Sequence, residues 1–279
     1  MWVGQQLADG LDFWGFLGSL ILGGIILGIY TGLLGYVGAK TGLSLDLLSQ
    51  RAFGEKGSYL PSAMTSFTQI GWFGVGSFVS GGTATPNFAR FAKDGKAGAI
   101  TTVVAFFIGN SLMFFFGAVS SIFVGGNDIF EVMVRLNLFY LAVLVLGLNI
   151  WTTNDNALYT AGLGLANIFH QRKKPMVLLS GIIGTVASVW LYCNFCGWLN
   201  ILNCTLPPVG MILVLAYFMN KEDFETDQPK LKTVDWFAVA GVILGAIVAN
   251  ILHWGIASIN GMVVAAVCYC VGQAVNKRK

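Results

Sequence analysis

Long uncharged stretches alternate with short basic segments along most of the chain. A helix that crosses the hydrocarbon core of a bilayer needs roughly 20 mainly apolar residues, and these stretches reach that length. Pro207 and Pro208, with the polar region Asn194 to Asn203, are expected to divide one stretch into two helices. We predict membrane helices within residues 13–39, 58–89, 97–127, 136 onward, 175–220, 236–252 and 259–275. The pattern therefore predicts an all-α polytopic membrane protein.

The basic residues predict which ends of these helices face the cytoplasm. Lys and Arg in short loops resist translocation, and every basic residue except Arg135 lies in alternate polar segments or at the end of the chain. Residues 1–12 contain no Lys or Arg and do not form a secretory signal. We therefore expect the helices themselves to direct insertion, with the basic segments inside.

The stretch 58–89 breaks this alternation. Both of its flanks are basic, so an even number of crossings should separate them, yet the stretch is too short for two full spans. Either two half-helices meet within the membrane, or sequence is missing there. A re-entrant turn could be formed by five glycines, Gly71, Gly74, Gly76, Gly81 and Gly82. Lipid permits such a turn only where protein or a cavity surrounds the irregular backbone.

Composition excludes several classes of protein. The chain is 56% hydrophobic and only 10% charged, whereas a soluble domain has about a quarter charged residues. A net charge of +3 spread over 279 residues does not predict a nucleic-acid partner. Cys193 and Cys196 form a C-x-x-C pair, but no second pair or histidine lies nearby at zinc spacing, so we interpret them as apolar filler.

One stripe of polar residues lies in the middle of a predicted membrane helix. Asn149, Thr152, Thr153 and Asn156 recur at i, i+3, i+4 and i+7, which places them on one helix face. Hydroxyl and carbonyl oxygens suit a small monovalent cation such as sodium. Hydrogen bonding between helices explains the same pattern equally well, so the spacing leaves both interpretations open.

Asp155 is an acid within a hydrophobic span, which by default indicates a proton relay or a counter-charge. It lies off the polar stripe, so pairing with a loop cation is the alternative. Its role stays open.

A second pattern suits a flat heterocycle. Gln69 and Trp72 are one helical turn apart, so a carboxamide and an indole share a face, and Phe78 could cover the other side of a bound ring. Packing of Trp72 on a glycine-rich neighbour is the alternative. Residues 78–82 resemble a helix break whose free backbone groups could bind a ligand. The chain contains no G-x-S-x-G or H-E-x-x-H motif, so we do not predict an enzyme.

Several strings of residues resemble bacterial cytosine permeases, of the nucleobase and cation symporter family. They include the segments around Leu27 and Leu34 and the segments 69–76, 106–114, 146–159 and 207–210. The similarity runs over almost the whole chain, in order.

The resemblance implies a leucine-transporter-like fold of two inverted five-helix repeats and two further helices. Residues 1–76 would be a remnant of the first repeat, 77–220 the second repeat, and 221–279 the two accessory helices. It also implies cytosine binding between Trp72 and Phe78, with polar contacts from Gln69, Ser80 and Asn149. Sodium, the coupling ion, would bind Thr152, Thr153 and the Asn149 carbonyl. No other cofactor is implied.

The same resemblance predicts a monomeric, multi-pass protein of the bacterial inner membrane that imports cytosine by sodium symport. Compared with the family, the chain begins partway through helix 1 and passes directly from Gly76 to Ser77, without the helices between. Either the sequence carries a real internal deletion or residues are not printed. The alternatives are therefore a non-transporting membrane fragment, or a transporter of a purine, a hydantoin or a vitamin.

Overall fold

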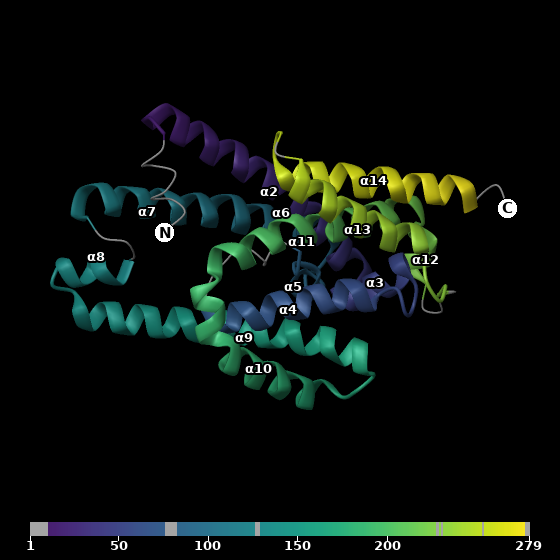
Figure 1. Cartoon of the computed structure of the whole chain (residues 1–279), viewed down its shortest axis with the longest axis horizontal. Helices are drawn as coiled ribbons and strands as arrows, with labels where there is room; N and C mark the ends of the chain where they lie inside the picture. Colours follow the sequence, from purple (N-terminus) through teal and green to yellow (C-terminus); the bar gives the residue numbers. More distant parts are fainter. Residues whose placement is uncertain are drawn as a thin grey trace.

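A computed structural model describes residues 11–75, 83–125, 129–226, 229, 231–252 and 254–276. Every regular element in these ranges is a helix (Figure 1). Residues 77, 78 and 80, and with them the expected helix break and most of the proposed re-entrant turn, lie outside the described ranges.

The helices follow the apolar stretches closely. Their bounds are α2 Phe13–Thr41, α3 Leu45–Phe53, α4 Tyr59–Val75, α5 Pro86–Ala89, α6 Gly95–Val104, the π-helix η2 Ala105–Gly109, α7 Asn110–Val124, α8 Ile129–Arg135, α9 Phe139–Phe169, α10 Lys173–Cys193, α11 Phe195–Met219, α12 Lys221–Glu225, α13 Trp236–Ile251 and α14 Ala257–Asn276.

Five helical segments in the described ranges are long and apolar enough to cross a membrane. They are Phe13–Thr41, Gly95–Val124, Lys173–Leu191, Gly197–Met219 and Ala257–Asn276. The 31 residues of α9 also exceed the length that a bilayer requires, although its central stripe is polar. The prediction of an all-α polytopic membrane protein is confirmed.

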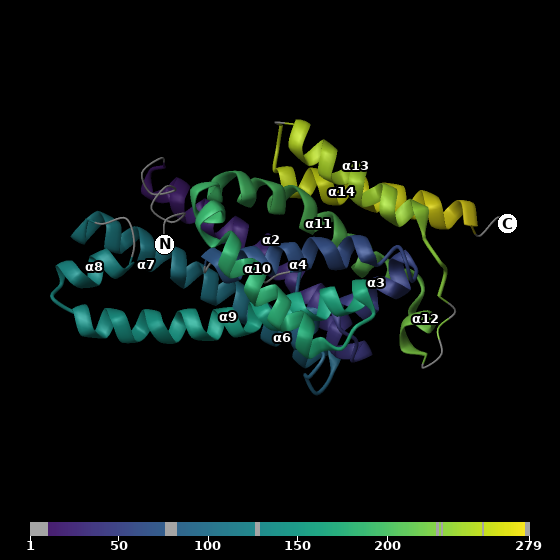
Figure 2. The same ribbon diagram turned by 60° about the horizontal axis from the view of Figure 1, so that its bottom comes forward.

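The helices pack in three groups. In the first, α2 lies along α6 and η2; in the second, α4 packs against α9 and α10. In the third, α13 and α14 run side by side against α11, as both views show (Figures 1 and 2). The largest buried apolar cluster joins α2, α3 and α11 to α13 and α14. The first half of α9 extends past α4 and α10 toward α8.

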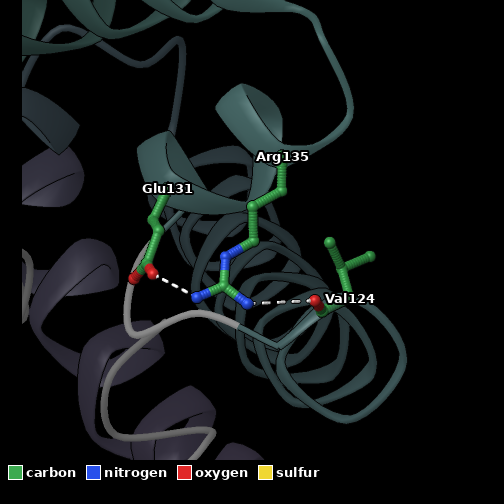
Figure 3. A network of polar contacts seen from close by, with 3 residues as sticks. All are labelled: Val124, Glu131 and Arg135. Carbon is green, nitrogen blue, oxygen red and sulfur yellow. Dashed lines mark hydrogen bonds and ion pairs between the residues drawn. The ribbon is translucent and has the colours of Figure 1, made fainter.

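The elements at the two ends of the molecule fit the charge pattern. Helices α3 and α12 and the end of α14 lie at one end of the long axis, and α8 lies at the other (Figure 1). Arg135, the basic residue that the alternation left apart, belongs to α8. Its guanidinium contacts Glu131 at 2.5 Å and donates to the Val124 carbonyl at 3.4 Å (Figure 3).

Two details differ from the prediction. Pro207 and Pro208 lie inside α11 and do not interrupt it, whereas the chain between residues 175 and 220 divides at Asn194, the first residue of the polar region that was also expected to divide it. An internal proline is tolerated in a membrane helix when neighbouring helices cover it. Pro208 is covered in this way, because a Cβ added to Gly245 or Gly261 would lie 3.3 or 3.1 Å from its ring. The other difference is the π-helical turn η2, which the apolar stretch 97–127 did not reveal.

Candidate functional site

A cavity of about 630 Å³ lies between α4, α5, α6, η2 and α9. A volume of this size is typical of ligand pockets, which measure about 300–1,000 Å³. None of its sixteen lining residues, all within the described ranges, carries a charge. They are Gln69, Ala84, Thr85, Phe88, Ala89, Phe91, Ala92, Gly98, Thr101, Thr102, Ala105, Phe106, Thr153, Asn156, Ala157 and Thr160. Uncharged polar groups and aromatic rings suit a neutral, flat molecule, since a buried ion would need a counter-charge.

Helix α9 supplies the polar wall of the cavity. Thr153, Asn156, Ala157 and Thr160 all line it, and their spacing of i, i+3, i+4 and i+7 is that of one helix face. Helix α4, which packs against α9, contributes Gln69, a residue that is 7% exposed. The cavity therefore brings together a residue predicted to contact the substrate, Gln69, and a residue predicted to bind the ion, Thr153.

Two other predicted residues are placed elsewhere. Asn149 and Thr152 are exposed and do not line the cavity. The Thr152 hydroxyl donates to the carbonyls of Leu148 and Asn149, both at 3.1 Å. Asp155 is exposed and is also absent from the lining. The side chains of Trp72, Phe78 and Ser80 lie outside the described part of the structure.

The short helix α5 forms one side of the cavity and is fixed by polar contacts at both ends. Near its start, the buried Asn87 carboxamide accepts a hydrogen bond from the Leu45 backbone N–H at 2.8 Å. At its end, Arg90 donates through Nη2 to the Tyr159 hydroxyl of α9. The Lys173 ammonium lies 3.4 Å from the centre of the same Tyr159 ring. These contacts hold α5 against α9 next to the cavity.

A chain of hydrogen bonds, buried at its Asp46 end, links α3, α4 and α9. Gln50 donates to Asn167 at 2.6 Å, Asn167 donates to Ser62 at 2.9 Å, and Ser62 donates to Asp46 Oδ1 at 2.6 Å. Burial raises the pKa of Asp46 to about 6, while the Ser62 hydrogen bond and the charge of Arg90 act to lower it. Asp46 lies on α3, outside the membrane-spanning helices, and is 5% exposed.

Comparison with known proteins identifies the family of the chain. The sequence profile of the family described as "Permease for cytosine/purines, uracil, thiamine, allantoin" matches residues 1–84 and 75–275. The chain belongs to this permease family. The family relationship inferred from the sequence strings is thereby confirmed, and the chain is a member of a transporter family.

Individual relatives agree with this assignment. The chain is 36% identical over 372 residues to the cytosine permease of Escherichia coli (strain K12), a match that covers 100% of the chain and 88% of that relative. The cytosine permease of Escherichia coli O157:H7 matches to the same extent. The allantoin permease of Bacillus subtilis (strain 168) is 34% identical over 82 residues, or 29% of the chain and 16% of that protein.

The matches also locate the irregularity in the membrane helices. The alignment with the Escherichia coli permease spans 372 positions, whereas this chain has 279 residues. At least 93 aligned positions of the Escherichia coli protein therefore have no counterpart in this chain. The two profile matches meet within residues 75–84. This overlap lies within the stretch 58–89, where the charge pattern required an even number of crossings.

Several lining residues were not predicted as site residues. Phe88, Phe106 and Thr160 face the cavity with Gln69 and Thr153. Thr160 could have been predicted from the sequence, because it lies seven residues after Thr153 and therefore on the same face of the helix. The two aromatic residues carried no such signal, since α5 and η2 are short elements whose facing sides depend on their packing against α2 and α6.

Proposed function

We propose that this chain imports cytosine or a related nucleobase across the bacterial inner membrane by sodium symport. The observation that supports this most strongly is the uncharged cavity that joins Gln69 of α4 to Thr153 of α9. A carboxamide offers a donor and an acceptor side by side, as the edge of a base requires. Phe88 and Phe106 supply apolar surface for the ring faces.

The coupling ion in this proposal is held by oxygen atoms of α9. Thr153 lies in the cavity wall, and the family resemblance adds Thr152 and the Asn149 carbonyl. Trp72, Phe78 and Ser80 complete the base site by the same resemblance, within a leucine-transporter-like fold. Ion binding would favour a state open to the outside, base stacking would favour closure, and coupling follows from the different affinities of the two states.

A competition experiment tests the substrate. Cytosine, uracil, adenine and allantoin are added to the purified protein in detergent, and ligand-induced stabilisation against heat is measured. We expect cytosine to stabilise the parent most. Replacing Gln69→Leu should weaken cytosine binding about tenfold or more, because a donor and an acceptor are lost together.

The matched control is Gln273→Leu, which changes a buried glutamine of α14 outside the cavity lining. It should leave the ligand-induced shift unchanged. Equal stabilisation of the Gln69→Leu variant and the parent would contradict the substrate assignment, and stabilisation by adenine or allantoin alone would point to a different substrate of the family.

The absence of at least 93 aligned positions favours a second candidate function, a non-transporting membrane protein left by internal deletion. Such a chain would show no ligand-induced stabilisation. The intact mass distinguishes an internal deletion from a sequence with unprinted residues. A chain with the deletion has a mass of 29.9 kDa, whereas a complete permease is heavier.

A further inference from the structure

The polar face of α9 continues past the predicted ion site. Thr153, Asn156 and Thr160 all line the cavity, and seven residues of helix correspond to about 10 Å along the axis. Of the α9 residues that line the cavity, Thr160 lies nearest the C-terminal end of the helix. Basic residues follow that end, so we expect it to face the cytoplasm. The cavity therefore extends from the level of Thr153 toward the cytoplasm along a single helix face.

The Thr160 hydroxyl differs from other helical threonines of this chain. A threonine inside a helix usually donates its hydroxyl hydrogen to the carbonyl four residues earlier. Within the described ranges, seven threonines do so at 2.6–2.9 Å: Thr31, Thr41, Thr65, Thr68, Thr102, Thr185 and Thr205. Thr160 is 2% exposed, and its Oγ1 has no hydrogen-bond partner within the described part of the chain.

The comparison with Thr102 shows that the cavity itself does not cause this difference. Thr102 lines the same cavity and is also buried, yet it donates to the Gly98 carbonyl at 2.6 Å. An unpaired buried hydroxyl destabilises a fold, and such groups concentrate where a ligand completes them. Thr160 lines the cavity, and the χ1 angle of a helical threonine has two accessible rotamers.

The surroundings of Thr160 define what this molecule can be. No lining residue within the described ranges is charged, and Phe88 of α5 lies in the same cavity as Thr160. A hydroxyl both donates and accepts hydrogen bonds, so it can serve an exocyclic oxygen, an exocyclic amine or a ring nitrogen. The matching ligand is a neutral, planar heterocycle with polar edges.

We propose that Thr160 contacts the transported base at a second subsite, on the cytoplasmic side of Gln69 and Thr153. The base occupies this subsite after it leaves Gln69 and before release. Phe88 covers a ring face, and the Thr160 hydroxyl binds a polar edge. This inference rests on the proposed function, because it identifies a further contact within the same cavity.

The test compares Thr160→Val, which replaces the hydroxyl by a methyl group, with Thr160→Ser, which keeps it. Equilibrium binding of cytosine, uracil and adenine is measured by calorimetry, and the unfolding temperature is measured without ligand. We expect Thr160→Val to weaken binding about three- to tenfold, the loss of one hydrogen bond. Thr160→Ser should bind like the parent. The control is Thr185→Val, an exposed threonine of α10 that does not line the cavity.

The unfolding temperature separates this role from a structural one. Because the hydroxyl is unpaired in the fold, Thr160→Val should unfold at the same temperature as the parent or higher, whereas loss of a structural hydrogen bond would lower it. Unchanged cytosine binding by Thr160→Val would overturn the inference and leave the proposed function standing. If the parent binds none of the three bases, both fail. Thr160→Ala provides the same comparison if the valine variant does not fold.

Discussion

At the scale of single residues, Asp46 has the environment with the clearest energetic consequence. Its carboxyl group is buried on α3 and accepts a hydrogen bond from Ser62, and burial raises its pKa from 3.8 to about 6. The folded protein therefore binds this proton more tightly than the unfolded chain does. Stability should fall as the pH rises from about 4 to about 6, and the penalty should be complete above that range.

We predict that Asp46→Asn removes this penalty. A rise of about two pKa units, at about 1.4 kcal/mol each, sets an upper limit of about 3 kcal/mol. The new Nδ2 group needs a partner of its own, so we expect a gain of about 1–3 kcal/mol at pH 8 and no gain near pH 4. Thermal unfolding in detergent across this pH range measures both.

The control for this change is Asp94→Asn at the exposed N-cap of α6, where asparagine caps a helix as well as aspartate does. It should shift the unfolding temperature little, and equally at both pH values. An Asp46→Asn variant that keeps the pH dependence of the parent would show that another group is responsible.

The residues of the cavity were only partly predictable. Gln69 and Thr153 carried signals of their own, a helical spacing to an aromatic residue and a polar stripe in an apolar span. The stripe did not reveal that Thr153 and Asn156 face the cavity while Asn149 and Thr152 do not. That distinction depends on which part of the α9 surface the neighbouring helices enclose, which is a property of the assembled helices.

At the scale of elements, the contact of α2 with α6 relies on glycine. A Cβ added to Gly35 would lie 2.5 Å from the Thr102 hydroxyl and 3.0 Å from the Gly98 carbonyl oxygen. Small residues allow helices in lipid to approach this closely. Because α6 and η2 form one side of the cavity, the spacing of this helix pair also sets the cavity's width.

We predict that Gly35→Ala lowers the unfolding temperature and weakens cytosine binding, since the two backbones must separate. Gly23→Ala in the same helix is the control, because a Cβ there meets nothing within 4 Å. It should be neutral or stabilising by up to about 1 kcal/mol, the difference in helix propensity. Equal effects of the two variants, measured by thermal unfolding and by binding, would contradict the packing explanation.

Most helices could be predicted from the sequence because the bilayer imposes a minimum apolar length. The bounds of α2 and α13 lie within two residues of the uncharged stretches that predicted them. The continuity of α11 through Pro207 and Pro208 could not be predicted, because Pro208 is accommodated by Gly245 and Gly261 from helices far along the chain. Local sequence does not contain that contact.

At the scale of the whole molecule, the charge pattern, the family matches and the cavity describe one permease. The basic segments require an even number of crossings within 58–89, and the two matches to the family profile overlap inside that stretch, at residues 75–84. The described helices nevertheless assemble a cavity from α4, α5, α6, η2 and α9. We therefore expect the part of the transport machinery on α4 and α9 to be present in this chain.

The central claim is that oxygen atoms on the cavity face of α9 couple a sodium ion to the import of a neutral base. Uptake of radiolabelled cytosine into proteoliposomes, with and without an inward sodium gradient, tests it most directly. We predict that the gradient stimulates uptake by the parent and by Thr185→Ala. In Thr153→Ala, the stimulation of uptake by sodium should fall tenfold or more, which corresponds to a loss of about 1.4 kcal/mol of ion-binding free energy. The unfolding temperature of this variant should be unchanged. Equal uptake by the parent with and without sodium would contradict the account.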